Sequence, residues 1–246
     1  MQDSPLLFRL IRRVIRGLTP RYTLSGVENL PPEPCVLVGN HAQMYGPLAA
    51  ELHLPRPARI WCVGEMMDRR EVPAYAFQDF WSAKPRAAHW FWRLASHVIA
   101  RPVAYVLSHA HTIPVYHDAR ILSTFRRSVA ALEAGEDLVI FPESPEPYNA
   151  VVTSFHSHFV DLAAMVWRRS GGILSFVPMY VAPRLGILSF GPPVRFDPQA
   201  PAEEERQRIG SELMEAITAQ ARALPPHTVI PYLNIPKSRY PLNTDE

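Results

Sequence analysis

The chain has 246 residues, of which 48% are hydrophobic and 20% charged, a balance that predicts a globular protein and excludes intrinsic disorder. The formal net charge is only +2 and no basic, aromatic-rich pattern accompanies it, so nucleic acid is not an expected partner. Cys35 and Cys62 lie in apolar runs without Cys-x-x-Cys spacing, which predicts free thiols in a reducing cytoplasm. No stretch contains the roughly 18 uncharged apolar residues that a membrane-spanning helix requires.

Residues 1–20 predict a basic amphipathic helix, because Ser4-Pro5 is typical of a helix start and Pro20 of an end. Apolar side chains recur between these points at helical spacing, at Leu7, Leu10, Ile11, Val14 and Leu18. Arginines cluster in this segment and directly after it, at Arg9, Arg12, Arg13, Arg16 and Arg21. We expect this helix to lie in the interface of an anionic membrane. Packing of its apolar side on the domain core would explain the same pattern.

Beyond residue 20, short apolar runs alternate with helical patterns. Strands are predicted at residues 35–38, 59–63, 112–115, 138–141, 173–181 and 186–190. Helices are predicted at residues 45–53, 73–83, 90–108 with a break near Pro102, 121–134, 155–169 and 201–224. This alternation indicates an α/β fold with a mostly parallel central sheet covered by helices on both faces. We expect one domain over residues 21–224 and a proline-rich C-terminal tail at 225–246.

Four short segments contain the most informative motifs. The first is Gly39-Asn40-His41-Ala42-Gln43-Met44-Tyr45-Gly46-Pro47, and the others are residues 113–120, 139–144 and 176–180. In their order and spacing they resemble the sequence blocks of glycerolipid acyltransferases that act on lysophosphatidic acid and related acceptors. The resemblance runs from about residue 36 to 224. It implies a glycerol-phosphate-acyltransferase-like fold, an acyl-coenzyme A or acyl carrier protein thioester as co-substrate, and no other cofactor.

The resemblance implies that His41 is the catalytic base. Acyl transfer to an alcohol needs a base for the hydroxyl proton, and a neutral imidazole at the end of a strand can supply one. The family block is Asn-His-x-x-x-x-Asp, but here Gly46 replaces the aspartate that would orient the imidazole. Loss of the corresponding carboxylate in a serine-protease triad costs about 10⁴ in rate. The alternative is that His41 is a strand-end histidine held by backbone partners.

The other expected site residues would bind the substrates. The resemblance implies that Arg120 and Glu143 position the acceptor, with Ser144 beside them. Backbone amides near Gly46 are expected to polarise the thioester carbonyl. A buried ion pair would be an equally good explanation for Glu143.

Two departures from the family blocks concern the acceptor. His117 stands where the second block has a phosphate-binding arginine, and Glu146 stands where the third block has another. Neither side chain reproduces bidentate binding of a phosphate by arginine, so lysophosphatidic acid is not the expected acceptor.

Other chemistries have little support in the sequence. The pairs His109-x-His111 and His156-x-His158 do not share a helical face, and no third ligand is suitably spaced, so no metal site is expected. No Gly-x-Ser-x-Gly elbow, phosphate-binding glycine loop or dinucleotide fingerprint occurs.

The sequence therefore predicts an O-acyltransferase of phospholipid metabolism, peripheral on the cytoplasmic face of a membrane, with a lipid-like hydroxyl acceptor. Two alternatives remain open: a catalytically inactive, membrane-associated lipid-binding homologue, and an acyl-thioester hydrolase. A carboxylate on the ring nitrogen of His41 that faces away from the crevice would favour the enzyme. A ring without such a partner would favour the inactive homologue.

Overall fold

The computed structural model describes residues 5–82, 84–116, 118–147 and 149–245. The chain forms two compact units. The helical unit comprises the residues up to Thr19 together with Ile60–Arg127, and the sheet unit comprises Pro20–Arg59 and Ser128–Glu246. Each unit is described by itself.

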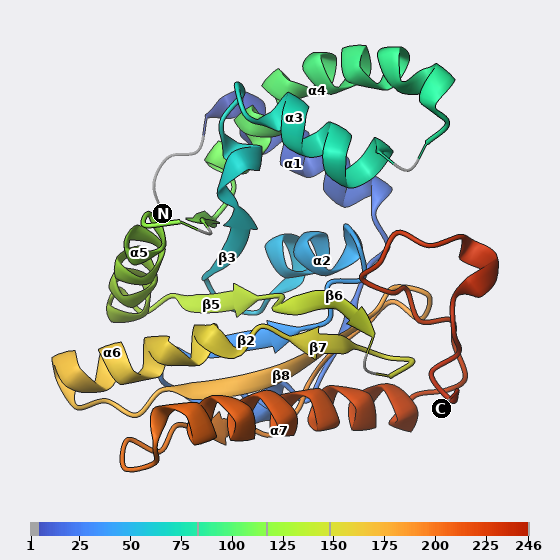
Figure 1. Ribbon diagram of the computed structural model, residues 1–246. Coiled ribbons are helices and arrows are strands. Elements are labelled where there is room, and N and C mark those ends of the chain that lie inside the picture. The colour runs from blue at the N-terminus through green and yellow to red at the C-terminus, as the bar shows by residue number, and fades with distance from the viewer. Residues whose placement is uncertain (1–4, 83, 117, 148, 246) are drawn as a thin grey trace. The chain divides into compact units, whose positions relative to one another are not determined.

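The sheet unit is built on a mostly parallel sheet (Figure 1). Its strands are β1 (Thr23–Ser25), β2 (Val36–Gly39), β5 (Asp137–Ile140), β8 (Ser175–Ala182), β9 (Ile187–Phe190) and β10 (Val194–Arg195). They run in the order β1-β9-β8-β2-β5, and β10 pairs with β8. The pairs β1–β9, β2–β8 and β2–β5 are parallel, whereas β8–β9 and β8–β10 are antiparallel. Every residue of β2 and β5 is buried, as expected for strands covered on both faces.

Helices cover this sheet. They are α2 (Tyr45–His53), α6 (Asp161–Ser170) and α7 (Ala202–Ala223), with single turns η1 (Val27–Asn29), η5 (Ser157–Val160) and η6 (Lys237–Arg239). Helix α7 buries Ile209, Leu213 and Ile217 completely at four-residue spacing and contacts β8. Figure 1 shows α2 on the opposite side of the sheet from α7. A hairpin of β6 (Glu143–Pro147) and β7 (Thr153–Phe155) follows β5.

The helical unit contains α1 (Leu6–Leu18), α3 (Val72–Ala76), a π-helical turn η3 (Phe77–Trp81) and α4 (His89–His109). Shorter elements are η2 (Gly64–Met67), η4 (Arg86–Ala88) and the parallel strands β3 (Ala58–Val63) and β4 (Thr112–Val115). Val72 and Ala76 of α3 pack against Ala100 and Ala104 of α4. Helix α5 (Ile121–Glu133) contains the division between the units. No helix of the described residues is long and apolar enough to span a membrane.

The α/β class and most predicted elements are confirmed, with α2 and β4 at the predicted residues. The predicted break near Pro102 is wrong, because α4 runs through it. Pro102 is exposed, and the packing of Ala100 and Ala104 on α3 holds the helix together on either side of the missing hydrogen bond. The helix predicted from residue 155 begins only at Asp161, after strand β7 and the turn η5.

The segment after α7 packs on the sheet unit. His227, Val229, Ile230 and Asn243 are buried, and Thr228 and Leu242 form an isolated bridge. The side-chain amide of Asn243 donates to the carbonyl oxygens of Ala221 and Leu224 at 2.8 and 3.2 Å. Residues 225–245 are therefore folded, despite their proline content.

Both cysteines are free thiols. Burial raises the pKa of Cys35 to about 12 and that of Cys62 to about 11, so neither is a reactive thiolate near neutral pH.

Candidate active site

His41 and Glu143 leave the sheet at the same edge. Strands β2 and β5 are parallel neighbours in which Val38 lies opposite Ile140. Asn40 and His41 directly follow β2, and Phe141, Pro142 and Glu143 directly follow β5. The carboxyl edge of a parallel sheet is the usual place for ligand binding in α/β proteins.

Asn40 fixes the point at which the chain leaves the sheet. Its amide oxygen accepts the N–H of Val181 at 2.7 Å, and its amide nitrogen donates to the carbonyl oxygen of Val181 at 3.1 Å. The side chain thus continues the β2–β8 ladder by one step in place of backbone. Asn40 is only 2% exposed, so its partners are hard to replace with water.

Glu143 holds the backbone of His41 and not its ring. Carboxylate oxygen Oε2 accepts the backbone N–H of His41 at 2.5 Å. Oxygen Oε1 accepts the backbone N–H and the hydroxyl of Thr153 at 3.1 and 3.2 Å. Burial raises the pKa of Glu143, and the hydrogen bonds from His41 and Thr153 partly oppose that rise. The carboxylate therefore ties the loop after β2 to the β6–β7 hairpin.

The His41 imidazole lies in an aromatic setting. Its ring forms T-shaped contacts with the rings of Phe141 and Tyr232, whose centroids lie 5.3 and 5.6 Å from its own. Atom Nδ1 is buried, and no described residue forms a hydrogen bond with it. Burial lowers the pKa of His41, an effect moderated by the backbone of Gln43 and of His41 itself. The ring is therefore neutral near pH 7, the form that can accept a proton.

The turn after His41 is strained. Ala42 and Gln43 both adopt positive φ, at 45° and 55°, although neither is glycine. Such residues cost about 1–3 kcal/mol each and cluster at functional sites. The side-chain amide nitrogen of Gln43, Nε2, donates to the hydroxyl of Tyr240 at 2.8 Å. This hydrogen bond anchors the turn to the C-terminal segment.

Gly46 is a glycine because the backbone passes too close for any side chain. A Cβ atom there would lie 2.5 Å from the carbonyl oxygen of His41 and 2.9 Å from the ring of Phe141. No aspartate can occupy this position without movement of the backbone. The amides of Tyr45 and Gly46 donate to Ala42 and His41 at 3.1 and 3.0 Å. We expected backbone amides near Gly46 to polarise the thioester carbonyl. The N–H groups of Tyr45 and Gly46 already donate hydrogen bonds within the turn.

The remaining predicted residues fall in different places. Ser144 is buried and its hydroxyl pairs with that of Ser154 at 2.5 Å across the β6–β7 hairpin. Arg120 belongs to the helical unit, where it pairs with Asp118 at 2.8 Å and lies over the ring of Tyr116. Its hydrogen bond with Asp118 raises its pKa. His117 lies outside the described residues.

Sequence reasoning missed Tyr232 and Tyr240. Both lie in the proline-rich segment that was predicted to be a tail, about 200 residues after His41. No periodicity or motif in that segment indicates a contact with His41. The role of Asn40 could have been predicted from the sequence, because an asparagine directly after a buried strand can form hydrogen bonds with the backbone of the neighbouring strand.

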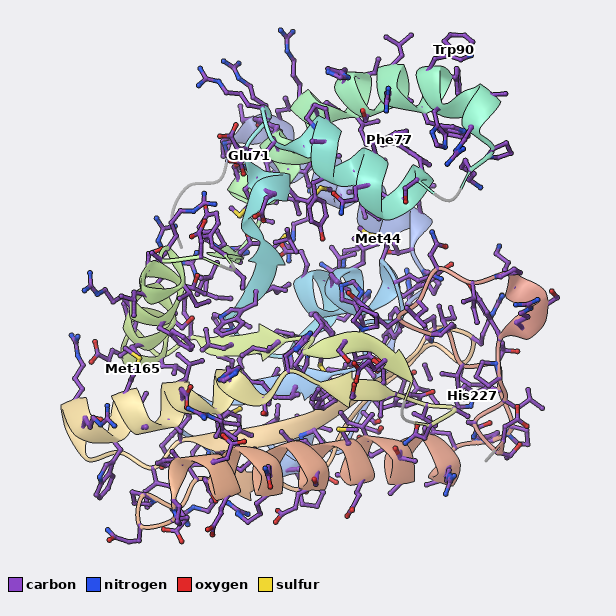
Figure 2. All side chains as sticks on the ribbon, viewed as in Figure 1. Met44, Glu71, Phe77, Trp90, Met165 and His227 are labelled. Atoms are coloured by element: carbon purple, nitrogen blue, oxygen red, sulfur yellow. The ribbon has the colours of Figure 1, made fainter. Side chains whose placement is uncertain are left out.

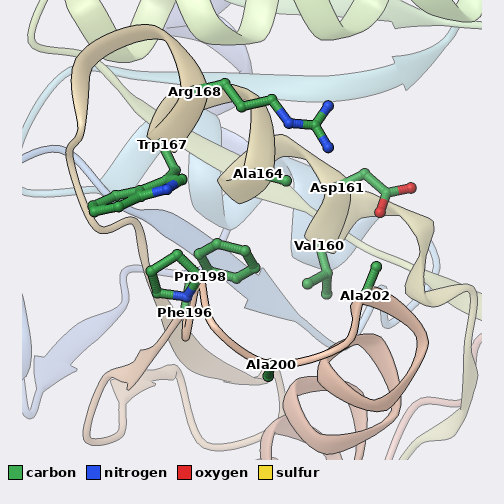
Figure 3. Close-up of a pocket in the computed structure, with 9 residues that line it drawn as sticks. All are labelled: Val160, Asp161, Ala164, Trp167, Arg168, Phe196, Pro198, Ala200 and Ala202. Atoms are coloured by element: carbon green, nitrogen blue, oxygen red, sulfur yellow. The ribbon is translucent and has the colours of Figure 1, made fainter.

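A shallow pocket of the sheet unit lies elsewhere (Figure 3). Trp167, Phe196 and Pro198 form its apolar wall, and Asp161 and Arg168 its polar rim. Asp161 is already paired with Arg206 at 2.8 Å. None of the residues around His41 lines this pocket, so it does not belong to the candidate site. Among the described residues, no three His, Cys, Asp or Glu side chains converge as metal ligands do.

The fold and site define an α/β protein with a neutral histidine at the carboxyl edge of its sheet. No family model and no curated protein matches the chain. Among solved structures it is similar to the 1-acyl-sn-glycerophosphate (LPA) acyltransferase PlsC from Thermotoga maritima, with a TM-score of 0.48 and 16% sequence identity. That match covers 91% of this chain and 85% of the other. Because the sequence identity and the TM-score are this low, any proposal for the function has to rest on the residues of this chain.

Proposed function

We propose that this protein is an acyltransferase that moves an acyl group from a thioester to the hydroxyl of a lipid-like acceptor. The observation that carries the proposal is the half-buried imidazole of His41, which directly follows β2 at the carboxyl edge of the sheet and lies against the rings of Phe141 and Tyr232. The order of the four motifs around it supports the same reaction class.

In the proposed reaction, His41 takes the proton of the acceptor hydroxyl as its oxygen attacks the thioester carbonyl carbon. Atom Nε2 is the nitrogen assigned to this step, because Nδ1 is buried. The tetrahedral intermediate then expels the thiolate, which recovers the proton from the imidazolium. An ester and a free thiol are the products, and no redox step occurs.

Glu143 has a positioning role in this proposal. The carboxylate is 5% exposed and accepts three hydrogen bonds from His41 and Thr153, so we assign it to holding the His41 loop. The acceptor is then a neutral or zwitterionic lipid alcohol, since His117 and Glu146 replace two phosphate-binding arginines.

Membrane association is part of the proposal. In α1, Phe8 is buried, whereas Leu6 and Leu18 are 77% and 82% exposed. Arginines occupy the remaining side of the helix, at Arg9, Arg12, Arg13 and Arg16. A helix that packs by one side and exposes leucines beside arginines suits the surface of an anionic membrane on the cytoplasmic side.

One observation favours a second candidate, an inactive lipid-binding homologue. In the tautomer whose Nε2 acts as base, Nδ1 carries the ring hydrogen, and no described side chain accepts it; only the backbone of Gln43 and of His41 favours the protonated ring. Without a carboxylate there, catalysis loses orientation and charge stabilisation, so any turnover is expected to be slow.

The deciding experiment supplies a long-chain acyl thioester with a panel of lysophosphatidic acid, lysophospholipids and neutral lipid alcohols. Acyl transfer that disappears in His41→Gln and persists in the exposed-histidine control His156→Gln supports the acyltransferase. Release of free fatty acid without ester formation indicates a thioester hydrolase. Lipid binding without either product indicates the inactive homologue.

A further inference from the structure

Helix α4 exposes an apolar stripe of its own. Its members are Trp90, Phe91, Leu94 and Val98, which are 71%, 49%, 60% and 69% exposed. Residues 90, 94 and 98 lie at four-residue spacing and so share one side of the helix. Figure 2 shows Trp90 pointing away from α3.

The opposite side of the same helix is packed. Ala100 and Ala104 contact Val72 and Ala76, while Ser96 is buried and donates to the carbonyl oxygen of Arg93 at 2.7 Å. The exposed stripe is therefore separate from the side of α4 that packs in the core of the helical unit. It is a second apolar surface, made of exposed side chains that adjoin one another along one side of the helix.

Charge around the stripe has one sign. Residues 80–116 contain no aspartate or glutamate but include Lys84, Arg86, Arg93 and Arg101. Arg93 is exposed, and its guanidinium lies over the ring of Phe77 at 5.1 Å from the centroid. Helix α1 of the same unit likewise has arginines and no acidic residue.

This charge selects the partner. In a symmetric dimer, the same patch of both copies meets itself, and cationic rims would then face cationic rims. An anionic lipid surface has the complementary charge and takes up apolar side chains at the same time. Tryptophan in particular favours the boundary between headgroups and acyl chains.

We propose that α4 is a second membrane-contacting helix, which inserts Trp90, Leu94 and Val98 into the interface of an anionic bilayer. The inference deepens the membrane association described above. It does not depend on acyl transfer, because it concerns binding alone. The two helices together give the helical unit two separate apolar contacts with lipid.

The test is co-sedimentation with vesicles of phosphatidylcholine mixed with phosphatidylglycerol, and with vesicles of phosphatidylcholine alone. The double variant Leu94→Glu/Val98→Glu is expected to weaken binding to anionic vesicles about tenfold or more, since two apolar contacts are replaced by anions. The matched control is Leu122→Glu on α5, an exposed leucine of the same unit at 59% exposure, with an expected change of less than about twofold. The double variant Leu10→Glu/Val14→Glu measures the contribution of α1 to vesicle binding and leaves the buried Phe8 in place.

A second measurement uses the unmodified protein. Brominated lipids placed in anionic vesicles are expected to quench a component of tryptophan fluorescence that is missing in Trp90→Phe. Equal quenching in both proteins overturns the inference, as does wild-type binding by the α4 double variant. A wild-type dimer in solution that dissociates in the α4 variant, with no vesicle binding by either, would show that a second copy covers the stripe.

Discussion

The carboxylate of Glu143 contacts His41 through the backbone N–H, at 2.5 Å, and leaves the imidazole ring to aromatic neighbours. The acidic group after β5 and the histidine after β2 are therefore coupled mechanically. This coupling sets the position of the ring, and among the described residues no side chain forms a hydrogen bond with Nδ1 to orient it further.

Glu143→Gln is expected to destabilise the protein by about 1–3 kcal/mol, because an amide NH₂ would face backbone donors that now have an acceptor. Acyl transfer should fall with it, since the His41 loop loses its anchor. Chemical denaturation and turnover measure the two effects. Glu204→Gln, at an exposed position of α7, is the control and should leave both unchanged. Wild-type stability in Glu143→Gln would contradict the positioning role.

Gly46→Asp is expected to destabilise the fold and not to restore a catalytic pair. The new Cβ would meet the carbonyl oxygens of His41 and Asn40 at 2.5 and 2.8 Å. Overpacking of this kind costs about 1–3 kcal/mol or more, and Gly46→Ala should carry most of that cost. Thermal unfolding of both variants and of the wild type measures this loss of stability. A stable Gly46→Asp protein with faster turnover would show that the backbone moves to admit the side chain.

The pH dependence of His41 has a definite sign. Burial lowers its folded pKa below the ordinary 6.5, so its contribution to stability is present above pH 6.5 and is lost as pH falls through the folded value. The acid limb of kcat/KM should accordingly lie below pH 6.5. His41→Gln should remove this part of the stability profile. An acid limb at or above 6.5 would mean that the ring is more solvated than its surroundings indicate.

Tyr240→Phe is expected to loosen the turn at Ala42 and Gln43, because it removes the hydroxyl that the Gln43 amide contacts. The loss should be about 0.5–1.5 kcal/mol of stability, with a lower kcat and a nearly unchanged KM. Tyr45→Phe is the control, since Tyr45 is exposed and adjoins the same turn. Equal behaviour of the two variants would show that the hydrogen bond between Gln43 and Tyr240 does not hold the turn.

Use of lysophosphatidic acid should improve relative to a neutral alcohol as pH is lowered toward about 6. The resemblance aligns His117 with a phosphate-binding arginine, and an imidazolium attracts a phosphate whereas a neutral imidazole does not. The ratio of the two kcat/KM values isolates this effect from His41, which acts on both substrates. His117→Gln should flatten the ratio. A strong preference for lysophosphatidic acid at neutral pH that is lost in Arg120→Ala would show that one arginine is enough.

Periodicity predicted the alternating α/β framework because buried strands such as Val36–Gly39 and amphipathic helices leave local patterns. It failed at Pro102, where packing of α4 on α3 outweighs the local preference against proline. The roles of Glu143 and Gly46 also depend on contacts between distant segments. Motif reasoning identified both positions, but the partner of Glu143 and the crowding at Gly46 follow only from the three-dimensional structure.

The anchor between Gln43 and Tyr240 joins positions 197 residues apart. At about 5–20 residues per second, a ribosome needs roughly 10–40 s to synthesise that stretch. During this interval the strained turn after His41 exists without the hydroxyl that holds it. Completion of the site therefore follows the synthesis of the sheet that carries it, and a nascent chain that already has β2, β5 and β8 still carries an unfinished histidine loop.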